Sequence, residues 1–91
     1  MSNENNDEVD IISYGEVYTN EGFFNLVDAL EVSYVLAEVT MEQRFDYDRK
    51  AEFARLSFFH KYDNNKPTVE FYIEKSIFEE VYPIYEAMRD L

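Results

Sequence analysis

The chain of 91 residues has no cysteine, only two glycines and only two prolines. Without cysteine it can form neither a disulfide framework nor a thiolate zinc site, so we expect a protein of the reducing cytoplasm. Its only glycines are Gly15 and Gly22, which cannot build a glycine-rich loop that holds a phosphate group. These absences exclude disulfide scaffolds, zinc fingers and P-loop enzymes.

Long apolar runs and a targeting signal are absent as well. The first ten residues, MSNENNDEVD, are polar and acidic, and no segment reaches the roughly 20 apolar residues that a membrane helix needs. We therefore expect neither a membrane span nor an export signal. We interpret residues 1–10 as a flexible acidic leader and residues 11–91 as a single domain, because a chain this short has room for one core.

Positive charge is missing from the first half of the chain. Residues 1–43 contain ten acidic residues and no Lys or Arg, whereas residues 44–91 contain ten acidic residues and all eight bases. The formal net charge is -12. Because self-repulsion on this scale costs stability, we expect the charge to serve the recognition of a partner.

Eight Phe and eight Tyr, within an apolar fraction of 46%, are enough for a compact core, and two apolar stripes predict helices. Residues 20–31 form the first helix, capped by Thr19 or Asn20, with these residues on its apolar side: Phe23, Phe24, Leu26, Val27 and Leu30. The second helix follows Ser76, which has capping-box spacing to Glu79, and Pro83 is expected to kink or restart it. Its apolar stripe is Ile77, Val81, Ile84, Tyr85 and Met88.

Three segments between these helices alternate with period two, as half-buried strands do. In the first, which begins at Val32, the residues on one side are Val35, Ala37, Val39, Met41 and Phe45, and those on the other are Glu38, Thr40, Glu42 and Arg44. In the second, the inward residues are Ala54, Leu56 and Phe58, and the outward ones are Arg55, Ser57 and Phe59. In the third, the inward residues are Val69, Phe71 and Ile73, and the outward ones are Glu70, Tyr72 and Glu74. The turn-like segments DYDRK and YDNNKP separate the strands.

The predicted fold is therefore α+β, of order αβββα, with a three-stranded antiparallel sheet and both helices on one face. Residues 11–18 are interpreted as a fourth, N-terminal edge strand or as a docking loop. The other face of the sheet is expected to be at least partly open. It would carry Glu38, Glu42, Arg44, Arg55, Phe59, Glu70, Tyr72 and Glu74.

The sequence offers little for catalysis or metal binding. His60 is the only histidine and has no cysteine to work with, so we expect a strand-end imidazole with a local hydrogen bond. Asp46-Tyr-Asp48 and Asp63-Asn-Asn65 lack the Gly and the terminal Glu of a calcium loop, so they are predicted to be turns. Paired catalytic carboxylates need a partly dry pocket, which so small an αβββα layer hardly provides. We predict no enzymatic activity, no cofactor and no metal.

The predicted element order is that of the double-stranded-RNA-binding domain, but that domain needs Lys and Arg against phosphates, and a net charge of -12 argues against direct nucleic-acid binding. The opposite hypothesis is that carboxylates take the place of phosphates, which follow one another at about 3.4 Å of rise along each DNA strand. On a helix, Glu21, Asp28 and Glu31 are separated by roughly 10 and 5 Å. On strands, about 13 Å separates Glu38 from Glu42 and Glu70 from Glu74.

In size, charge and architecture the chain resembles the DNA-mimic inhibitors that phages use against host defences, including anti-restriction and anti-CRISPR proteins. The resemblance implies a phage or mobile-element inhibitor that acts in the host cytoplasm. Its partner would be a basic nucleic-acid-binding protein or nuclease complex, whose binding site it would occupy. The predicted contacts, taken from the acidic faces and their aromatic neighbours, are Glu21, Asp28, Glu31, Tyr34, Glu38, Glu42, Phe59, Glu70, Tyr72 and Glu74.

Two other functions remain open. An immunity protein or antitoxin would cover the basic active site of a toxin and therefore shares the charge argument. A small dimeric scaffold or adaptor would instead use Phe59, Tyr72 and their neighbours as an apolar interface, with a homodimer as the expected state. This last function does not require the negative charge.

Overall fold

A computed structural model describes residues 10–46 and 49–89 of the chain. The predicted leader, residues 1–10, lies outside the described residues except for Asp10. Tyr47 and Asp48, at the centre of the predicted DYDRK turn, lie outside them as well. The strands on either side of that turn are described as far as Asp46 and from Arg49 onward.

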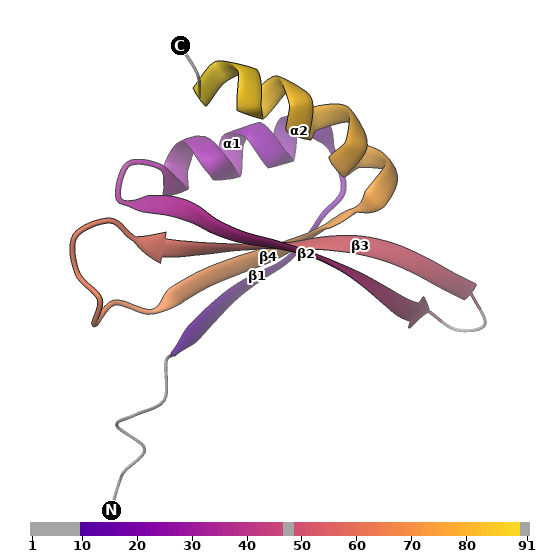
Figure 1. The fold of residues 1–91 in the computed structure, drawn as a ribbon. Coiled ribbons are helices and arrows are strands. Elements are labelled where there is room, and N and C mark those ends of the chain that lie inside the picture. The colour runs from indigo at the N-terminus through magenta and orange to yellow at the C-terminus, as the bar shows by residue number, and fades with distance from the viewer. Residues whose placement is uncertain (1–9, 47–48, 90–91) are drawn as a thin grey trace, which may run out of the picture.

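The elements follow one another in the order βαβββα. They are β1 (Ile11–Val17), α1 (Asn20–Leu30), β2 (Tyr34–Asp46), β3 (Arg49–His60), β4 (Thr68–Glu74) and α2 (Lys75–Arg89). The strands form one four-stranded sheet in the order β1-β4-β3-β2, and both helices lie on the same face of it (Figure 1). Within the described residues, neither helix is long and apolar enough to cross a membrane. The fold is a mixed α+β fold.

The N-terminal strand corrects the predicted topology. The sequence predicted three antiparallel strands with an uncertain fourth, whereas β1 is a full member of the sheet and pairs in parallel with β4. Because β2, β3 and β4 alternate in direction, β1 and β2 run the same way at opposite edges. The pairing of β1 is irregular between Ser13 and Glu16, where Gly15 has a φ of 79°. This irregularity explains why the segment lacks a clean alternating pattern.

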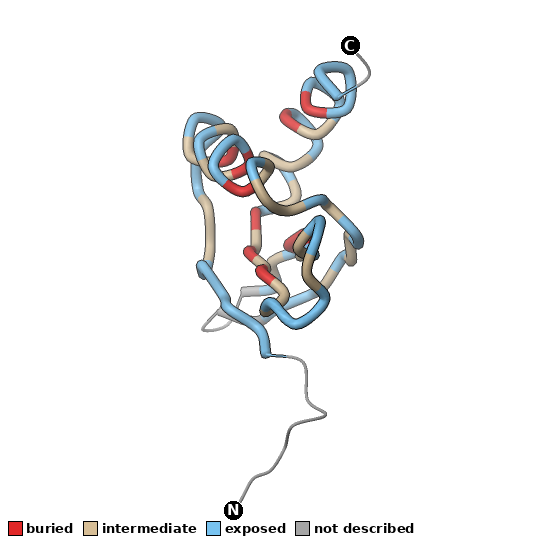
Figure 2. The backbone as a smooth tube through the Cα atoms, turned by 90° about the vertical axis from the view of Figure 1, so that its left-hand side faces the viewer, coloured by how far each residue is buried: buried red, intermediate tan, exposed pale blue. Residues whose placement is uncertain are grey.

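The hydrophobic core lies between the helices and the sheet. The ring of Phe58 on β3 stacks on that of Phe71 on β4 at 5.8 Å between centroids, and Phe23 of α1 meets Phe71 edge-on at 6.1 Å. All three side chains are fully buried. Figure 2 shows the buried residues on the helices and on the strands that they cover. The predicted inward residues of β3 and β4 are confirmed as core: Ala54, Leu56, Phe58, Val69, Phe71 and Ile73.

The first helix is confirmed as predicted. It begins at Asn20, after Thr19, whose Oγ1 accepts a hydrogen bond from the Gly22 backbone N–H at 2.9 Å. Its predicted apolar side faces inward and is buried at Phe23, Val27 and Leu30 and half-buried at Phe24 and Leu26. The outward positions Glu21 and Asp28 are exposed.

A bulge near the start of β2 corrects the predicted facing of its first residues. Leu36 pairs with Phe58 but Glu38 pairs with Ser57, so Ala37 is an extra residue with no counterpart on β3. After the bulge, the described residues face as the sequence predicted. A period-two pattern cannot reveal an inserted residue, because the residues on both sides of it still alternate.

Before the bulge the prediction is wrong. Val35 pairs with Phe59, which points away from the core, so Val35 lies on the uncovered face and is 39% exposed. The predicted inward position of Ala37 is also wrong, since Ala37 is the bulged residue and is exposed. The strand also begins at Tyr34, later than the predicted Val32.

The second helix corrects two further predictions. It begins at Lys75, directly after β4, and the Ser76 hydroxyl donates to Glu74 Oε1 at 2.9 Å instead of capping the helix. It also runs through Pro83 to Arg89 as one helix, so of the predicted kink or restart, the restart does not occur. The apolar stripe is only partly inward: Val81 and Tyr85 are buried, and Ile84 and Met88 are about half exposed.

Replacing Phe58 by Ala should destabilise the fold severely. The change removes a fully buried ring from the stack with Phe71 and leaves a cavity, so the free energy of unfolding should fall by about 3–5 kcal/mol. Chemical denaturation followed by circular dichroism measures this loss. Phe59→Ala is the matched control, because Phe59 is 52% exposed and should lose much less. Equal losses in both variants would contradict the observed facing of β3.

Candidate functional site: the open face of the sheet

The face of the sheet that the helices leave uncovered is defined by the pairing registers, and we call it the open face. Its residues form rows that run across the strands. The central rows are Glu38–Ser57–Glu70, Thr40–Arg55–Tyr72–Glu16 and Glu42–Phe53–Glu74. The predicted sharing of one face by the four strand glutamates is confirmed, and β1 adds Glu16, which the sequence analysis did not include.

Four of these residues, Glu38, Glu42, Glu70 and Glu74, form a rectangle that we call the carboxylate frame. Its two sides lie on β2 and β4, with β3 between them. Two strand spacings separate the sides by about 10 Å, and four residues along each strand span about 13 Å. Arg55 of β3 lies in the middle row, at the centre of the frame.

Arg55 offsets part of the negative charge of the frame. Its Nη1 lies 3.3 Å from Glu42 Oε2. Burial lowers the pKa of the Arg55 guanidinium, but the carboxylate of Glu42 and the hydroxyl of Tyr72 raise it by more, so this pKa lies above its ordinary value. Glu70 adds a further attraction. The arginine is therefore a permanent positive charge that reduces repulsion among the surrounding glutamates.

Arg44 crosses the open face from one edge strand to the other. Its guanidinium lies 4.9 Å from the ring centroid of Tyr72 and 5.5 Å from that of Phe53. On the far edge, its Nη1 donates to Glu16 Oε2 at 2.8 Å. Phe53 is only 9% exposed although no helix covers this face, because Arg44 lies over it. The alternation that places Arg55 outward also places Phe53 outward, so its position was readable from the sequence.

Acids outnumber bases on the open face. The acids are Glu16, Glu38, Glu42, Glu70 and Glu74, and the bases are Arg44 and Arg55. Ion pairs engage Glu16 and Glu42. Among the described residues, Glu38, Glu70 and Glu74 have no ion pair within 4.0 Å. These three carboxylates are therefore the ones most available to a basic partner.

The predicted acids of the first helix lie in the helix layer, away from the open face. Glu21 and Asp28 are exposed, but Glu31 is half-buried and accepts a hydrogen bond from the Tyr85 hydroxyl. Glu31 is thus part of the contact between the two helices, which corrects its predicted solvent-facing position. It also borders a groove of about 140 Å³ lined by Phe24, Val27, Asp28, Glu31, Tyr85, Met88 and Arg89.

The predicted aromatic contacts have three different environments. Tyr34 is half-buried, packs against the core and meets His60 edge-on at 5.1 Å between ring centroids. Tyr72 is half-buried beneath Arg44. Phe59 alone is well exposed, at 52%, and lies beside Val35 at one end of the open face. Of the three, only Phe59 offers a large free apolar surface.

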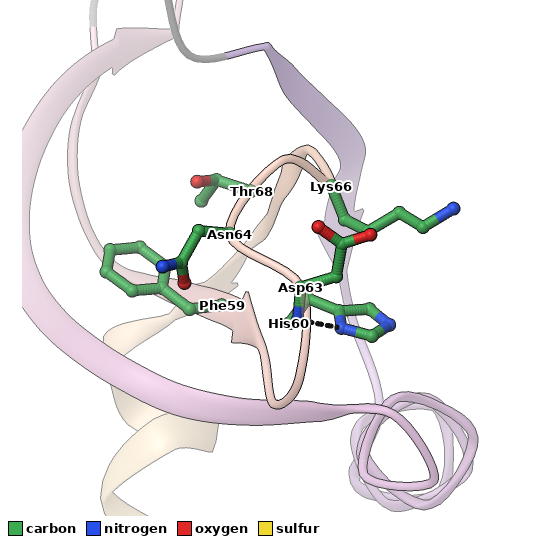
Figure 3. Close-up of a pocket in the computed structure, with 6 residues that line it drawn as sticks. All are labelled: Phe59, His60, Asp63, Asn64, Lys66 and Thr68. Atoms are coloured by element: carbon green, nitrogen blue, oxygen red, sulfur yellow. Dashed lines mark hydrogen bonds between the residues drawn. The ribbon is translucent and has the colours of Figure 1, made fainter.

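A pocket of about 220 Å³ adjoins Phe59, where the loop between β3 and β4 folds back (Figure 3). His60 Nδ1 accepts hydrogen bonds from the backbone N–H groups of Tyr62 and Asp63, at 3.2 and 3.1 Å. Asp63 Oδ1 accepts one from the Asn65 N–H at 2.9 Å. The predicted local hydrogen bond of His60 and the predicted turn at Asp63 are confirmed. The pocket lining is Phe59, His60, Asp63, Asn64, Lys66 and Thr68.

Two polar side chains of this pocket, those of His60 and Asp63, are already used to shape the loop. Within residues 10–46 and 49–89, no group of three or more His, Cys, Asp or Glu residues could hold a metal ion. The pocket therefore offers a concave shape beside an exposed aromatic ring. The pocket is not predictable from the sequence, because its shape depends on how the loop folds.

Removing Arg44 should destabilise the fold modestly. Arg44→Ala deletes the ion pair with Glu16 and uncovers two rings, and the free energy of unfolding should fall by about 1 kcal/mol because both kinds of contact are partly exposed to water. A double-mutant cycle with Glu16→Ala, measured by urea denaturation, isolates the ion pair. Gln43→Ala, at the next exposed position of β2, is the control. Strict additivity of the Arg44 and Glu16 changes would show that their contact contributes nothing.

Tyr85 should make the fold sensitive to alkaline pH. Burial, followed by the hydrogen bond and charge of Glu31, raises the pKa of Tyr85 well above its ordinary value of 10.0. Below pH 10 its stabilising effect is complete, because the tyrosine is protonated in both the folded and unfolded states. Above pH 10 the unfolded chain releases this proton while the folded chain keeps it, so stability is lost, with a limiting slope of about 1.4 kcal/mol per pH unit.

The free energy of unfolding of Tyr85→Phe should therefore fall less steeply above pH 10 than that of the unchanged protein. Urea denaturation at a series of pH values measures the two slopes. Tyr62→Phe is the control, because Tyr62 is 83% exposed. Identical slopes in the unchanged protein and in Tyr85→Phe would contradict the protonated state assigned to Tyr85.

No protein-family model, no curated protein and no solved structure matches this chain. The function is therefore inferred from the residues of the open face.

Proposed function

We propose that this protein is a non-catalytic inhibitor that occupies the basic nucleic-acid-binding site of a target protein, with its open face as a DNA mimic. The carboxylate frame is the observation that carries the proposal. Its two sides, on β2 and β4, are about 10 Å apart, close to the roughly 12 Å width of the DNA major groove. Along each side, the separation of about 13 Å between the two glutamates matches about four base-pair steps of 3.4 Å.

The electrostatics support the same role. A net charge of -12 attracts a basic partner over a long range and speeds its association. At close range, Glu38, Glu70 and Glu74 keep charges that no internal ion pair within the described residues neutralises. Their carboxylates can therefore accept hydrogen bonds from the Lys and Arg side chains that otherwise hold phosphates.

Apolar contacts would supply much of the binding energy. Phe59 and Val35 are 52% and 39% exposed and pair with each other at one end of the open face. Interfaces commonly depend on a few aromatic anchors, with charges that steer the approach. We propose that Phe59 is this anchor and that the carboxylate frame orients the partner around it.

The proposed setting is a phage or mobile-element counter-defence system in the cytoplasm of a host, with a nuclease complex of the anti-CRISPR or anti-restriction kind as the target. An immunity protein for a basic toxin would use the same charges. Competition with DNA distinguishes a DNA mimic from an immunity protein. DNA displaces a mimic from its partner, whereas it displaces an immunity protein only if the active site of the toxin itself binds nucleic acid.

The test compares two charge reversals of equal size on different faces. Glu38→Lys with Glu70→Lys alters the open face, and Glu21→Lys with Asp28→Lys alters the exposed side of α1. Each immobilised protein is incubated with a nuclease-treated bacterial lysate, and retained proteins are eluted with a short DNA duplex at constant ionic strength. Circular dichroism first establishes that both variants are folded.

The unchanged protein should retain DNA-binding proteins that the duplex releases. The open-face variant should lose about tenfold or more of this retention, because close interfacial charges each contribute on the order of 1 kcal/mol or more. The α1 variant should retain most of it. Equal loss in both variants would show that net charge alone acts, and failure of the duplex to displace the partner would rule out DNA mimicry.

A further inference from the structure

Among the described residues, the edge strand β2 has one unpaired side. One side of Tyr34–Asp46 pairs with β3, and in the described part of the chain no strand pairs with the other side. Edge strands present unpaired backbone N–H and C=O groups, which proteins commonly guard with Lys, Pro or a bulge. β2 has neither Lys nor Pro, and its bulge at Ala37 leaves the pairing of residues 38–46 regular. This regular segment is suited to pair with another strand.

We propose that β2 pairs antiparallel with β2 of a second copy, about a two-fold axis that passes through Met41. Each residue then lies opposite the one equally distant on the other side of Met41. The paired segment is Glu38–Arg44, which begins just after the bulge and ends inside the strand. The two sheets join into one continuous sheet.

Charge complementarity favours this register. It places Glu38 opposite Arg44 of the second copy, and the two-fold axis makes this contact occur twice. Both residues lie on the open face, because their partners on β3, Ser57 and Ala51, lie on the same side as Arg55. Opposite charges that face each other directly across two strands are favourable. Glu38 has no ion pair among the described residues, so the contact would satisfy a free charge.

Neighbouring registers are less favourable. An axis at Thr40 places Glu38 opposite Glu42 twice, and an axis at Glu42 places that glutamate opposite itself. Like charges directly opposite each other destabilise strand pairing. An axis at Met41 instead brings together two methionine side chains that are each 46% exposed in the single chain. To reach Glu38 of the second copy, Arg44 has to leave Glu16 of its own chain, which lies at the far edge of the sheet, so the pairing exchanges one ion pair for another.

The dimer does not rest on the proposed inhibitory function. If both hold, the two open faces lie side by side, Glu38 of each copy pairs with Arg44 of the other, and Glu70 and Glu74 are the frame carboxylates left for the partner. If a variant that cannot dimerise still inhibits the partner, the proposed pairing of β2 in the unchanged protein still stands. If the dimer binds no basic partner, the proposed pairing stands as well.

Sedimentation velocity on the purified full chain tests the pairing. The unchanged protein should sediment as a dimer. Glu38→Arg places two arginines opposite each other at both ends of the segment and should weaken the dimer by about tenfold or more. The double change Glu38→Arg with Arg44→Glu exchanges the charges and should restore it. Glu70→Arg is the control, because Glu70 lies on β4, inside the sheet, and should leave the dimer unchanged.

Single cysteines test the register in a chain that has none. Met41→Cys places two thiols opposite each other at the axis and should form a disulfide-linked dimer on mild oxidation. Gln43→Cys, two residues from the axis, should not. A monomer in the unchanged protein, an assembly larger than a dimer, or cross-linking through Gln43 in place of Met41 would overturn the proposal.

Discussion

The stacked rings of Phe58 and Phe71, closed by Phe23 from the first helix, determine how the rest of the molecule is arranged. Because Leu56, Phe58 and Phe71 point to the same face of β3 and β4, both helices pack there. The opposite face is left without a covering layer. This face is exposed to solvent, and Arg44 and Arg55 stabilise it.

These two arginines determine how the open face is packed and charged. Arg44 shields Phe53 and joins the two edge strands, while Arg55 lies among glutamates that would otherwise repel one another. A chain with a net charge of -12 can keep acids this close because a few bases are placed at their centre. Each base also reduces the negative charge available to a partner, so the available charge lies at the corners of the frame, on Glu38, Glu70 and Glu74.

Much of the fold was predictable where local pattern and burial agree. The first helix and the facing of β3 and β4 followed from periodicity, because their apolar residues alternate without interruption. The four glutamates of the carboxylate frame followed from the same alternation. The sequence also indicated the roles of Thr19 as a cap and of His60 as a local hydrogen-bond acceptor.

The rest depends on contacts that no local pattern contains. The bulge at Ala37 preserves alternation on both sides, so only the pairing with β3 reveals it. The contact of Glu31 with Tyr85 joins two helices far apart in the chain and turns an apparent surface acid into a structural one. Ser76 has capping-box spacing, but β4 passes directly into α2 and leaves no separate cap position. The parallel pairing of β1 is likewise a long-range contact.

That pairing has a consequence for how the protein is made. Ile11 and Val17, near the start of the chain, pair with Thr68 and Ile73, so β1 has no strand to join until most of the chain has left the ribosome. The β2–β3 hairpin can form earlier from neighbouring residues. Glu16, the residue that receives Arg44, arrives with β1. The open face is therefore completed only after β4 has been made.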